Sequence, residues 1–290
     1  MKAKITFIAL LVGFTSINAV AQTNTIDYLG QTPPSDIPRV FAPGIVTISD
    51  RYEYGLSISP DGKEIFFTCE QPGNGLMRVV KTGNTWSSPK LANLRKSNAW
   101  EFEAFYKNSG DTLFFTSKTS QSSGKDQFYF VVKSGNSWGE AQKLNSPVND
   151  NTVMWSTFSK NRDLYYANED DNYVYVSKYK NGKYLAGTKM NAGMHPYPAP
   201  DGSFFLYDNN GSIFVRFKSS KGEGWNEAIP LNNSINTASW EGNASLSPDG
   251  KYMFFARYND TGGKSDIYWV NSDFIKELKP QTNSINQVVK

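Results

Sequence analysis

A five-fold internal repeat constrains this chain more than any other feature of its sequence. The signature is clearest at residues 57–67, SISPDGKEIFF, and it returns at residues 245–255 as SLSPDGKYMFF. The pair that ends the signature recurs as Phe66-Phe67, Phe114-Phe115, Tyr165-Tyr166, Leu206-Tyr207 and Phe254-Phe255. Successive pairs start 48, 51, 41 and 48 residues apart. A period of this length is typical of one four-stranded blade of a β-propeller.

Each repeat unit contains the parts of such a blade. A short strand leads into a turn of the Pro-Asp-Gly type, in which Gly accepts the positive φ of a tight hairpin, and two strands rich in aromatic and β-branched residues follow. A fourth strand, with the order aromatic, Pro or Ala, aliphatic, is missing from the fifth unit. Phe41, Pro43 and Ile45 show that order before the first unit. We therefore expect the N-terminal segment to supply the outer strand of the last blade and close the ring.

The sequence thus predicts an all-β protein, a β-propeller of five four-stranded blades closed by an N-terminal strand. Six blades are the alternative, if residues 22–37 and 271–290 build one together. Residues 38–280 resemble the WD-like repeats of the TolB-type β-propeller family, whose mark is the Ser-Pro-Asp-Gly-Lys turn seen at residues 59–63 and 247–251. The resemblance implies a stand-alone, secreted propeller. It assigns no activity, because one fold hosts many functions.

The N-terminus has the features of a secretory signal peptide. Lys2 and Lys4 precede an apolar run over residues 5–14, which is too short to span a bilayer, and Ala19-Val20-Ala21 fits a cleavage site. We expect a signal peptide at 1–21, a flexible leader at 22–37, the propeller domain at 38–280 and a C-terminal tail at 281–290. The product should be an exported monomer, periplasmic or extracellular, without a transmembrane segment.

Composition excludes several classes of function. Without residues 1–21 the formal net charge of +3 falls to +1, so nucleic acid is not an expected partner. The single Cys69 cannot form an internal disulfide, and the single His195 excludes the usual multi-histidine zinc sites. No nucleophile elbow, phosphate loop or dinucleotide fingerprint occurs in the sequence.

Two positions of the repeat carry polar side chains where the chain enters the innermost strand. The first position holds Glu53, Glu101, Val153, Gly193 and Glu241, and the second, two residues later, holds Gly55, Glu103, Trp155, His195 and Asn243. Alternate residues of a strand share a face, so both sets are expected near one mouth of the central channel. Glu53, Glu101 and Glu241 would come from three consecutive blades, with His195 on a neighbouring blade.

Three converging carboxylates would repel one another, which raises at least one pKa. They could bind a hard cation such as Ca²⁺, the one cofactor considered, or serve with His195 as the acid and base of glycan chemistry. His195 could also act with Tyr197. The simpler alternative is that each Glu accepts backbone N–H groups of a neighbouring blade and only holds the inner strands in place. The candidate ligand contacts are Trp100, Glu103, Trp155, Tyr197, Trp240 and Asn243, because aromatic faces beside acids suit sugar rings or an extended peptide.

These features favour an exported, non-catalytic binding module whose channel mouth receives a glycan, a peptide or an envelope protein. The alternative is a carbohydrate-active enzyme, a glycoside hydrolase or polysaccharide lyase, that uses the acidic residues and His195 of the same rim. An enzyme needs an acid and a base at a defined separation, whereas a binding module needs shape and aromatic faces. The sequence alone does not separate the two.

Overall fold

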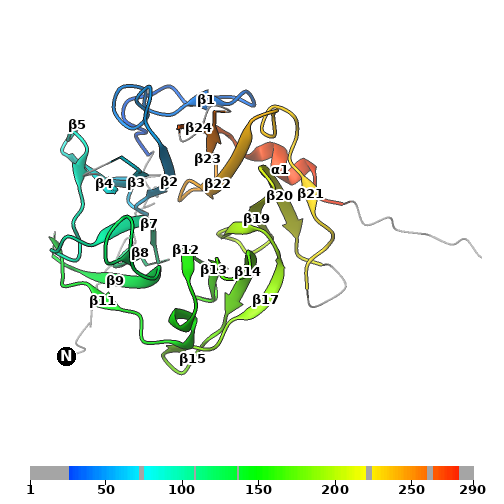
Figure 1. Ribbon diagram of the computed structural model, residues 1–290. Coiled ribbons are helices and arrows are strands. Elements are labelled where there is room, and N and C mark those ends of the chain that lie inside the picture. The colour runs from blue at the N-terminus through cyan, green and yellow to red at the C-terminus, as the bar shows by residue number, and fades with distance from the viewer. Residues whose placement is uncertain are drawn as a thin grey trace, which may run out of the picture.

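Five antiparallel sheets surround a central axis in the computed structural model (Figure 1). The structure describes residues 26–71, 75–107, 109–135, 137–219, 224–259 and 264–280. The fold is a five-bladed β-propeller, as the repeat predicts. The predicted signal peptide at 1–21, the first part of the leader at 22–25 and the tail at 281–290 lie outside the described residues.

Each blade begins with a strand beside the axis and ends with a short strand at the rim. Blade 1 consists of β2 (Glu53–Ile58), β3 (Glu64–Cys69), β4 (Leu76–Thr82), β5 (Thr85–Trp86) and β6 (Lys90–Leu91). Blade 2 consists of β7 (Trp100–Tyr106), β8 (Thr112–Lys118), β9 (Gln127–Ser134), β10 (Ser137–Trp138) and β11 (Gln142–Lys143). Blade 3 consists of β12 (Val153–Phe158), β13 (Leu164–Asn168), β14 (Tyr173–Ser177) and β17 (Thr188–Ala192), and the hairpin of β15 (Tyr179–Lys180) and β16 (Lys183–Tyr184) is inserted before β17.

The last two blades follow the same plan. Blade 4 consists of β18 (Met194–Pro198), β19 (Phe204–Asn209), β20 (Ser212–Phe217) and β21 (Ile229–Pro230), and blade 5 of β22 (Trp240–Leu246), β23 (Tyr252–Tyr258), β24 (Ser265–Asn271) and β1 (Arg39–Val40). A 3-10 helix (Pro147–Asp150) joins blades 2 and 3, and α1 (Asp273–Glu277) follows β24. No helix among the described residues has the length and apolar character needed to cross a membrane.

The ring is closed by the N-terminal segment, as predicted. β1 pairs antiparallel with β24, with Arg39 opposite Trp269. The backbone N–H of Phe41 continues the ladder and donates to the carbonyl oxygen of Ile267 at 2.7 Å. Blade 5 is therefore built from both ends of the propeller sequence, which protects an edge that would otherwise be open.

The closing strand is shorter than the order Phe41, Pro43, Ile45 predicts. β1 ends at Val40, and after Phe41 the chain turns, with the N–H of Ile45 donating to the carbonyl of Ala42 at 3.0 Å. Pro43 has no N–H to extend the ladder. Of the three predicted residues, only Phe41 contributes to the pairing, and its fully buried side chain packs beneath blade 5.

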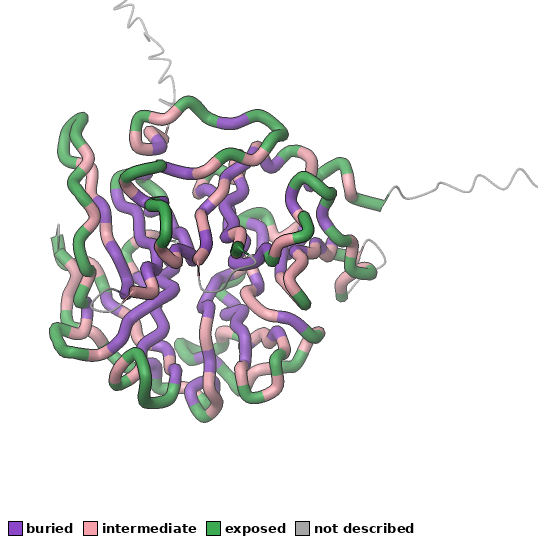
Figure 2. Tube along the Cα trace, turned by 45° about the horizontal axis from the view of Figure 1, so that its top comes forward, coloured by how far each residue is buried: buried purple, intermediate pink, exposed green. Residues whose placement is uncertain are grey.

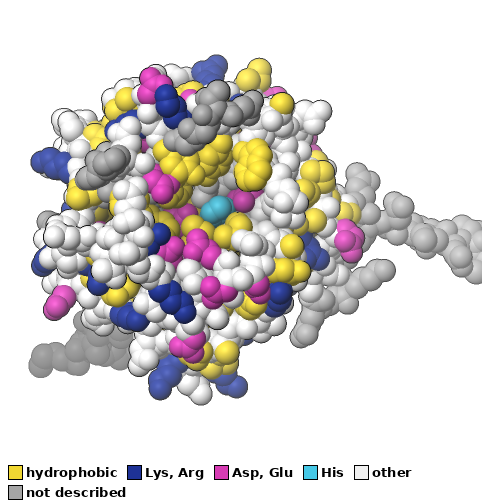
Figure 3. All heavy atoms as spheres, in the orientation of Figure 1, with side chains coloured by type: hydrophobic (Ala, Val, Ile, Leu, Met, Phe, Trp, Pro, Cys, Tyr) yellow, Lys and Arg dark blue, Asp and Glu magenta, His cyan; other side chains and the backbone are white. Residues whose placement is uncertain are grey.

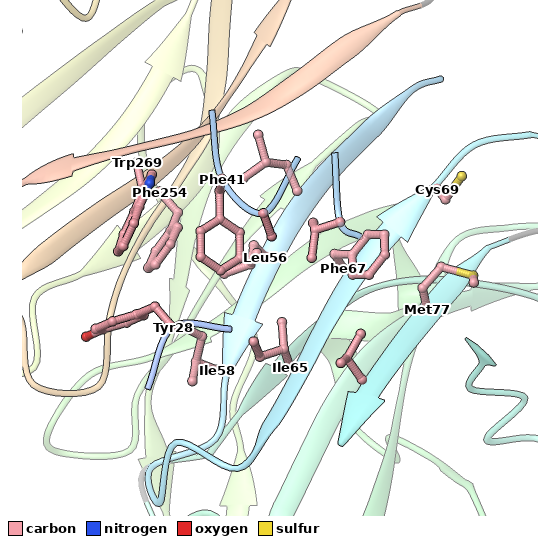
Figure 4. Close-up of a cluster of buried hydrophobic side chains, with 14 residues drawn as sticks. Tyr28, Phe41, Leu56, Ile58, Ile65, Phe67, Cys69, Met77, Phe254 and Trp269 are labelled. Atoms are coloured by element: carbon pink, nitrogen blue, oxygen red, sulfur yellow. The ribbon is translucent and has the colours of Figure 1, made fainter. Parts of the chain in front are cut away.

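Part of the predicted flexible leader is packed onto the propeller. Tyr28 is only 4% exposed, and its ring lies 5.3 Å from that of Trp269 (Figure 4). The ring of Tyr252 lies 5.1 Å from that of Tyr28. The neighbouring Asp27 forms an ion pair with Lys81 of blade 1 at 2.5 Å. The prediction of flexibility for residues 22–37 is therefore wrong around Tyr28, because burial of one aromatic side chain anchors the segment between blades 5 and 1.

The aromatic pairs of the repeat fill the spaces between blades. Successive residues of a strand point to opposite faces of the sheet. Phe66 of β3 accordingly joins the core cluster shared with blade 2, whereas Phe67 joins the cluster shared with blade 5. Figure 2 shows the buried residues gathered along the strands, with turns and outer edges exposed. The aromatic pair of the repeat therefore recurs because each blade packs against a neighbour on both of its faces.

Candidate functional site

Every innermost strand carries a β-bulge at the same point of the repeat. The first bulged residue has a positive φ in each blade: Gly55 (65°), Glu103 (51°), Trp155 (59°), His195 (48°) and Asn243 (56°). We call these five residues the bulge ring. They are the second of the two predicted sets. A left-handed conformation costs about 1–2 kcal/mol for a residue with a Cβ, so four of the five blades retain strain at this level of the channel.

The side chains of the bulge ring converge from different blades. A Cβ atom added to Gly55 of blade 1 would lie 3.4 Å from Glu103 Cγ of blade 2 and 3.4 Å from Trp155 Cζ3 of blade 3. The ring of Trp155 in turn lies edge-on to the imidazole of His195 of blade 4, with centroids 5.0 Å apart. Gly55 therefore leaves the space at the axis that the larger side chains occupy.

Hydrogen bonds and one longer contact between charged groups connect four blades at this level. Glu103 Oε2 accepts from the backbone N–H of Trp155 at 3.0 Å, and Glu103 Oε1 lies 3.8 Å from His195 Nε2. His195 Nδ1 lies 2.8 Å from Asp208 Oδ1, which also accepts from the backbone N–H of Asn243 at 3.0 Å. His195 is thus held between two carboxyl groups, with Asp208 as its close partner.

The acid and the imidazole of this network have shifted pKa values. Burial raises the pKa of Glu103 to about 8, against the opposing effect of the nearby His195. Burial lowers the pKa of His195, but the charge and hydrogen bond of Asp208 outweigh it and raise that pKa above its ordinary value. Burial and the neighbouring Asp126 raise the pKa of Glu169 to about 7. Groups that titrate near neutral pH can both donate and accept a proton at working pH.

The first predicted set behaves differently, since its acidic residues fasten nearby segments of chain. Glu101 accepts from the backbone N–H groups of Leu94 at 2.8 Å and Arg95 at 2.6 Å, and so holds the segment that leads into β7. Glu53 is fully buried and forms a very short ion pair with Arg51. Burial raises the pKa of Glu53 to about 7, although Arg51 opposes the shift.

Glu241 has the same kind of local role. It accepts from the backbone N–H of Thr237 at 3.0 Å and from Arg257 Nε at 2.9 Å. Across the ranges that the structure describes, no three or more His, Cys, Asp and Glu side chains form a group that could hold a metal ion. Glu53, Glu101 and Glu241 thus form no such group, and each binds partners close to it in sequence or on the adjacent strand, where the simpler alternative expected backbone groups of a neighbouring blade.

The predicted aromatic contacts divide among three environments. Trp100 is 6% exposed and packs against Phe102, and Trp155 is fully buried in the bulge ring. Trp240 is 65% exposed. Tyr197 faces the opposite end of the channel, where its hydroxyl donates to the carbonyl of Leu246 at 3.2 Å, so it is not the partner of His195. Of these four predicted contacts, Trp240 alone presents a large aromatic surface to solvent at the mouth that holds His195.

A hollow of about 760 Å³ opens at this mouth, which we call the polar mouth. Its wall includes Tyr52, His195, Asp208, Asn210, Trp240 and Tyr258. Figure 3 looks into it and shows the single histidine of the chain at the bottom, with Asp and Glu side chains close by. The volume falls within the range of about 300–1,000 Å³ that is usual for small-molecule sites.

Sequence reasoning missed Asp208. Asp208 lies on β19 and is paired with Met194 of β18. The equivalent positions in the second strands of the other blades hold smaller residues, namely Thr68, Thr116, Ala167 and Ala256. A charged residue at a position otherwise held by small side chains was a signal in the repeat alignment. It marks blade 4 as the blade that departs from the common pattern.

Comparison with known proteins shows the fold. No protein-family model and no curated protein matches the sequence. Among solved structures, GH43B of the Bacteroides ovatus xyloglucan PUL matches with a TM-score of 0.52 and 13% identity over 81% of this chain and 54% of its own. TolB from Acinetobacter baumannii matches with a TM-score of 0.48 and 12% identity over 77% and 55%. A gluconolactonase from Xanthomonas campestris matches with a TM-score of 0.48 and 11% identity over 83% and 97%.

This chain thus spans about half the length of the GH43B and TolB chains. At such identities the likeness shows a β-propeller and nothing finer. The five-bladed propeller expected from the repeats is present in the structure, and no family is shown for the chain. One fold serves many activities, and the residues of the polar mouth have to carry any functional conclusion.

Proposed function

We propose that this chain is an exported, non-catalytic binding module that receives a glycan in the hollow of the polar mouth. Export rests on the signal peptide predicted at residues 1–21 and implies a periplasmic or extracellular ligand. The observation that carries the proposal is the exposed Trp240 on the wall of a hollow that is otherwise polar.

Trp240 is fixed as a platform. A Cβ atom added to Gly211 would lie 2.8 Å from Trp240 Cγ, so the indole rests directly against the backbone at Gly211 while 65% of the residue stays exposed. A sugar ring combines an apolar face of C–H groups with a polar edge. A rigid aromatic surface beside hydrogen-bonding groups matches both parts of such a ligand.

The polar part of the hollow offers groups of both kinds. Asp208 presents an acceptor and Asn210 an amide, while Tyr258 lies on the wall with its hydroxyl bonded to the side chain of Asn243. The buried Glu103 Oε1 and Asn243 Nδ2 have no hydrogen-bond partner among the described residues. Buried polar atoms are normally paired, so these two favour a ligand or an ordered water that reaches the bulge ring.

A glycan array on the purified protein tests the proposal, followed by titration of any hit against Trp240→Ala. We expect the variant to lose most of the affinity, because one aromatic stacking contact is worth about 0.5–1.5 kcal/mol beyond its buried area. Leu185→Ala is the matched control, since Leu185 is 45% exposed and lies away from the hollow. Equal binding by both variants would exclude Trp240 as the platform.

A second candidate function is favoured by the pair of His195 and Asp208. A carboxylate at 2.8 Å from Nδ1 orients an imidazole as a general base, and Glu103 with a pKa of about 8 provides an acid. The protein would then be a glycoside hydrolase or polysaccharide lyase that uses the same mouth. A product assay on each array hit decides between the two, with Asp208→Asn expected to abolish turnover while binding persists.

A further inference from the structure

The channel contains a second hollow at its opposite end, separated from the polar mouth by aromatic side chains. The ring of Phe105 lies 4.5 Å from that of Trp155 and 6.2 Å from that of Tyr197. Trp155 belongs to the bulge ring, so Phe105 and Tyr197 form the next layer along the axis. These aromatic side chains therefore lie between the two hollows.

This second hollow, which we call the apolar mouth, has a volume of about 280 Å³ and receives residues from all five blades. Its walls are formed by large apolar side chains, namely Leu56, Phe105, Phe158, Tyr197 and Leu246. Three prolines of the repeat turns, Pro60, Pro200 and Pro248, stand at its rim. The volume lies just below the range of drug-sized ligand sites, so the hollow suits a smaller molecule.

The charged residues that line the apolar mouth are both lysines. Lys107 and Lys160 are among the residues that line it, and no Asp or Glu is. Lys107 is partly buried with its ammonium 4.8 Å from the ring of Tyr179, and burial together with the positive charge of Arg162 lowers its pKa. Lys160 is exposed. Positive charge is therefore concentrated on the side formed by blades 2 and 3.

The aspartates of the repeat turns lie outside the lining of the hollow, where each is hydrogen-bonded within its own turn. Asp61 accepts from the hydroxyl of Ser59 at 2.6 Å and from the backbone N–H of Lys63 at 3.1 Å. Asp249 likewise accepts from the hydroxyl of Ser247 at 2.7 Å. These carboxylates serve the hairpins, and none of them lines the hollow.

We propose that the apolar mouth is a second binding site, for a small carboxylate with an aromatic or branched apolar body. The body would fill the space between Leu56, Tyr197 and Leu246, and the carboxylate would face Lys160 at the rim. Burial of apolar area supplies most of the affinity, while the ammonium group selects for a negative charge. The site is independent of the glycan proposal, since the aromatic layer separates the two hollows.

The test is calorimetric titration of the purified protein with 4-phenylbutyrate and with its uncharged amide. We expect the carboxylate to bind more tightly than the amide by about two- to fivefold, the range of an exposed ion pair. Methyl resonances of Leu56 and Leu246 should shift in NMR spectra, and those of Ile275, in the core behind blades 4 and 5, should not. No binding of either compound, or shifts at the polar mouth instead, would overturn the proposal.

Two variants test whether Lys160 provides the positive charge that selects the carboxylate. Lys160→Met should remove the preference for the carboxylate over the amide while leaving amide binding unchanged. Lys180→Met is the matched control, because Lys180 is exposed on the hairpin of blade 3 and does not line the hollow. If Lys160→Met keeps the full preference, the assigned role of Lys160 is wrong. Trp240→Ala should bind 4-phenylbutyrate normally, which keeps this result distinct from failure of the glycan proposal.

Discussion

Truncation of Tyr28 to Ala should destabilise the propeller, although this residue lies ahead of every strand. Tyr28 is 4% exposed and its ring contacts those of Tyr252, Phe254 and Trp269. Removal of a large buried aromatic side chain costs about 3–5 kcal/mol. A domain of this size loses about 2–4 °C of melting temperature per kcal/mol, so we expect a decrease of about 6–20 °C.

Two further variants separate the contributions to this effect. Tyr28→Phe keeps the ring and removes the hydroxyl, which donates to Asp249 at 3.3 Å, and should cost about 0.5–1.5 kcal/mol. Ile37→Ala changes a residue of the same segment that is 70% exposed and should leave the melting temperature within about 2 °C, as for most surface substitutions. Thermal and urea unfolding measure all three. If Tyr28→Ala has the same melting temperature and urea midpoint as Ile37→Ala, the packing of Tyr28 does not stabilise the fold.

Three other predictions follow from the channel. Glu101→Gln should cost about 1–3 kcal/mol in urea unfolding, because an amide cannot accept both backbone N–H groups; a variant as stable as the parent would refute the fastening role. The pKa of Glu103 is raised from 4.5 to about 8, so its stabilising effect is complete below pH 4.5 and is lost as pH rises through 8. Glu103→Gln should therefore reduce the fall in unfolding free energy between pH 5 and 8.5, and an unchanged pH profile would contradict this. Gly211→Ala should weaken glycan binding by displacing Trp240, whereas Gly182→Ala, with a similar φ of 79° and nothing within 4 Å, should bind normally; equal binding by the two would argue against the platform.

The blade count was predictable because the repeat signature has a direct physical basis. Phe66 and Phe67 point to opposite faces of β3 and fill two different spaces between blades, so the pair marks the second strand of a unit. Closure by the N-terminal segment was predictable from the pattern at Phe41, but the bounds of the closing strand were not. β1 has two residues and is held by backbone hydrogen bonds to β24, which leave no pattern of side chains to follow.

The candidate site was predicted in part. The repeat alignment singled out the positions of the bulge ring, and the structure places Glu103 Oε1 3.8 Å from His195 Nε2. Glu101 and Glu241 were expected to meet as well, because strict alternation along a strand puts both sets on one face. Their actual partners are backbone N–H groups a few residues earlier in the chain and, for Glu241, also Arg257 on the adjacent strand. The spacing of acidic residues in the sequence does not indicate such local contacts.

The bulge ring also has a consequence for engineering. The same bulge, with a positive φ at its first residue, occurs in all five blades. The residue at that position is Gly, Glu, Trp, His or Asn, and the strand pairing continues on either side of it in each case. The scaffold thus tolerates chemical variety at five points that face a common axis. A combinatorial library confined to residues 55, 103, 155, 195 and 243 would sample new recognition chemistry without redesign of a single blade.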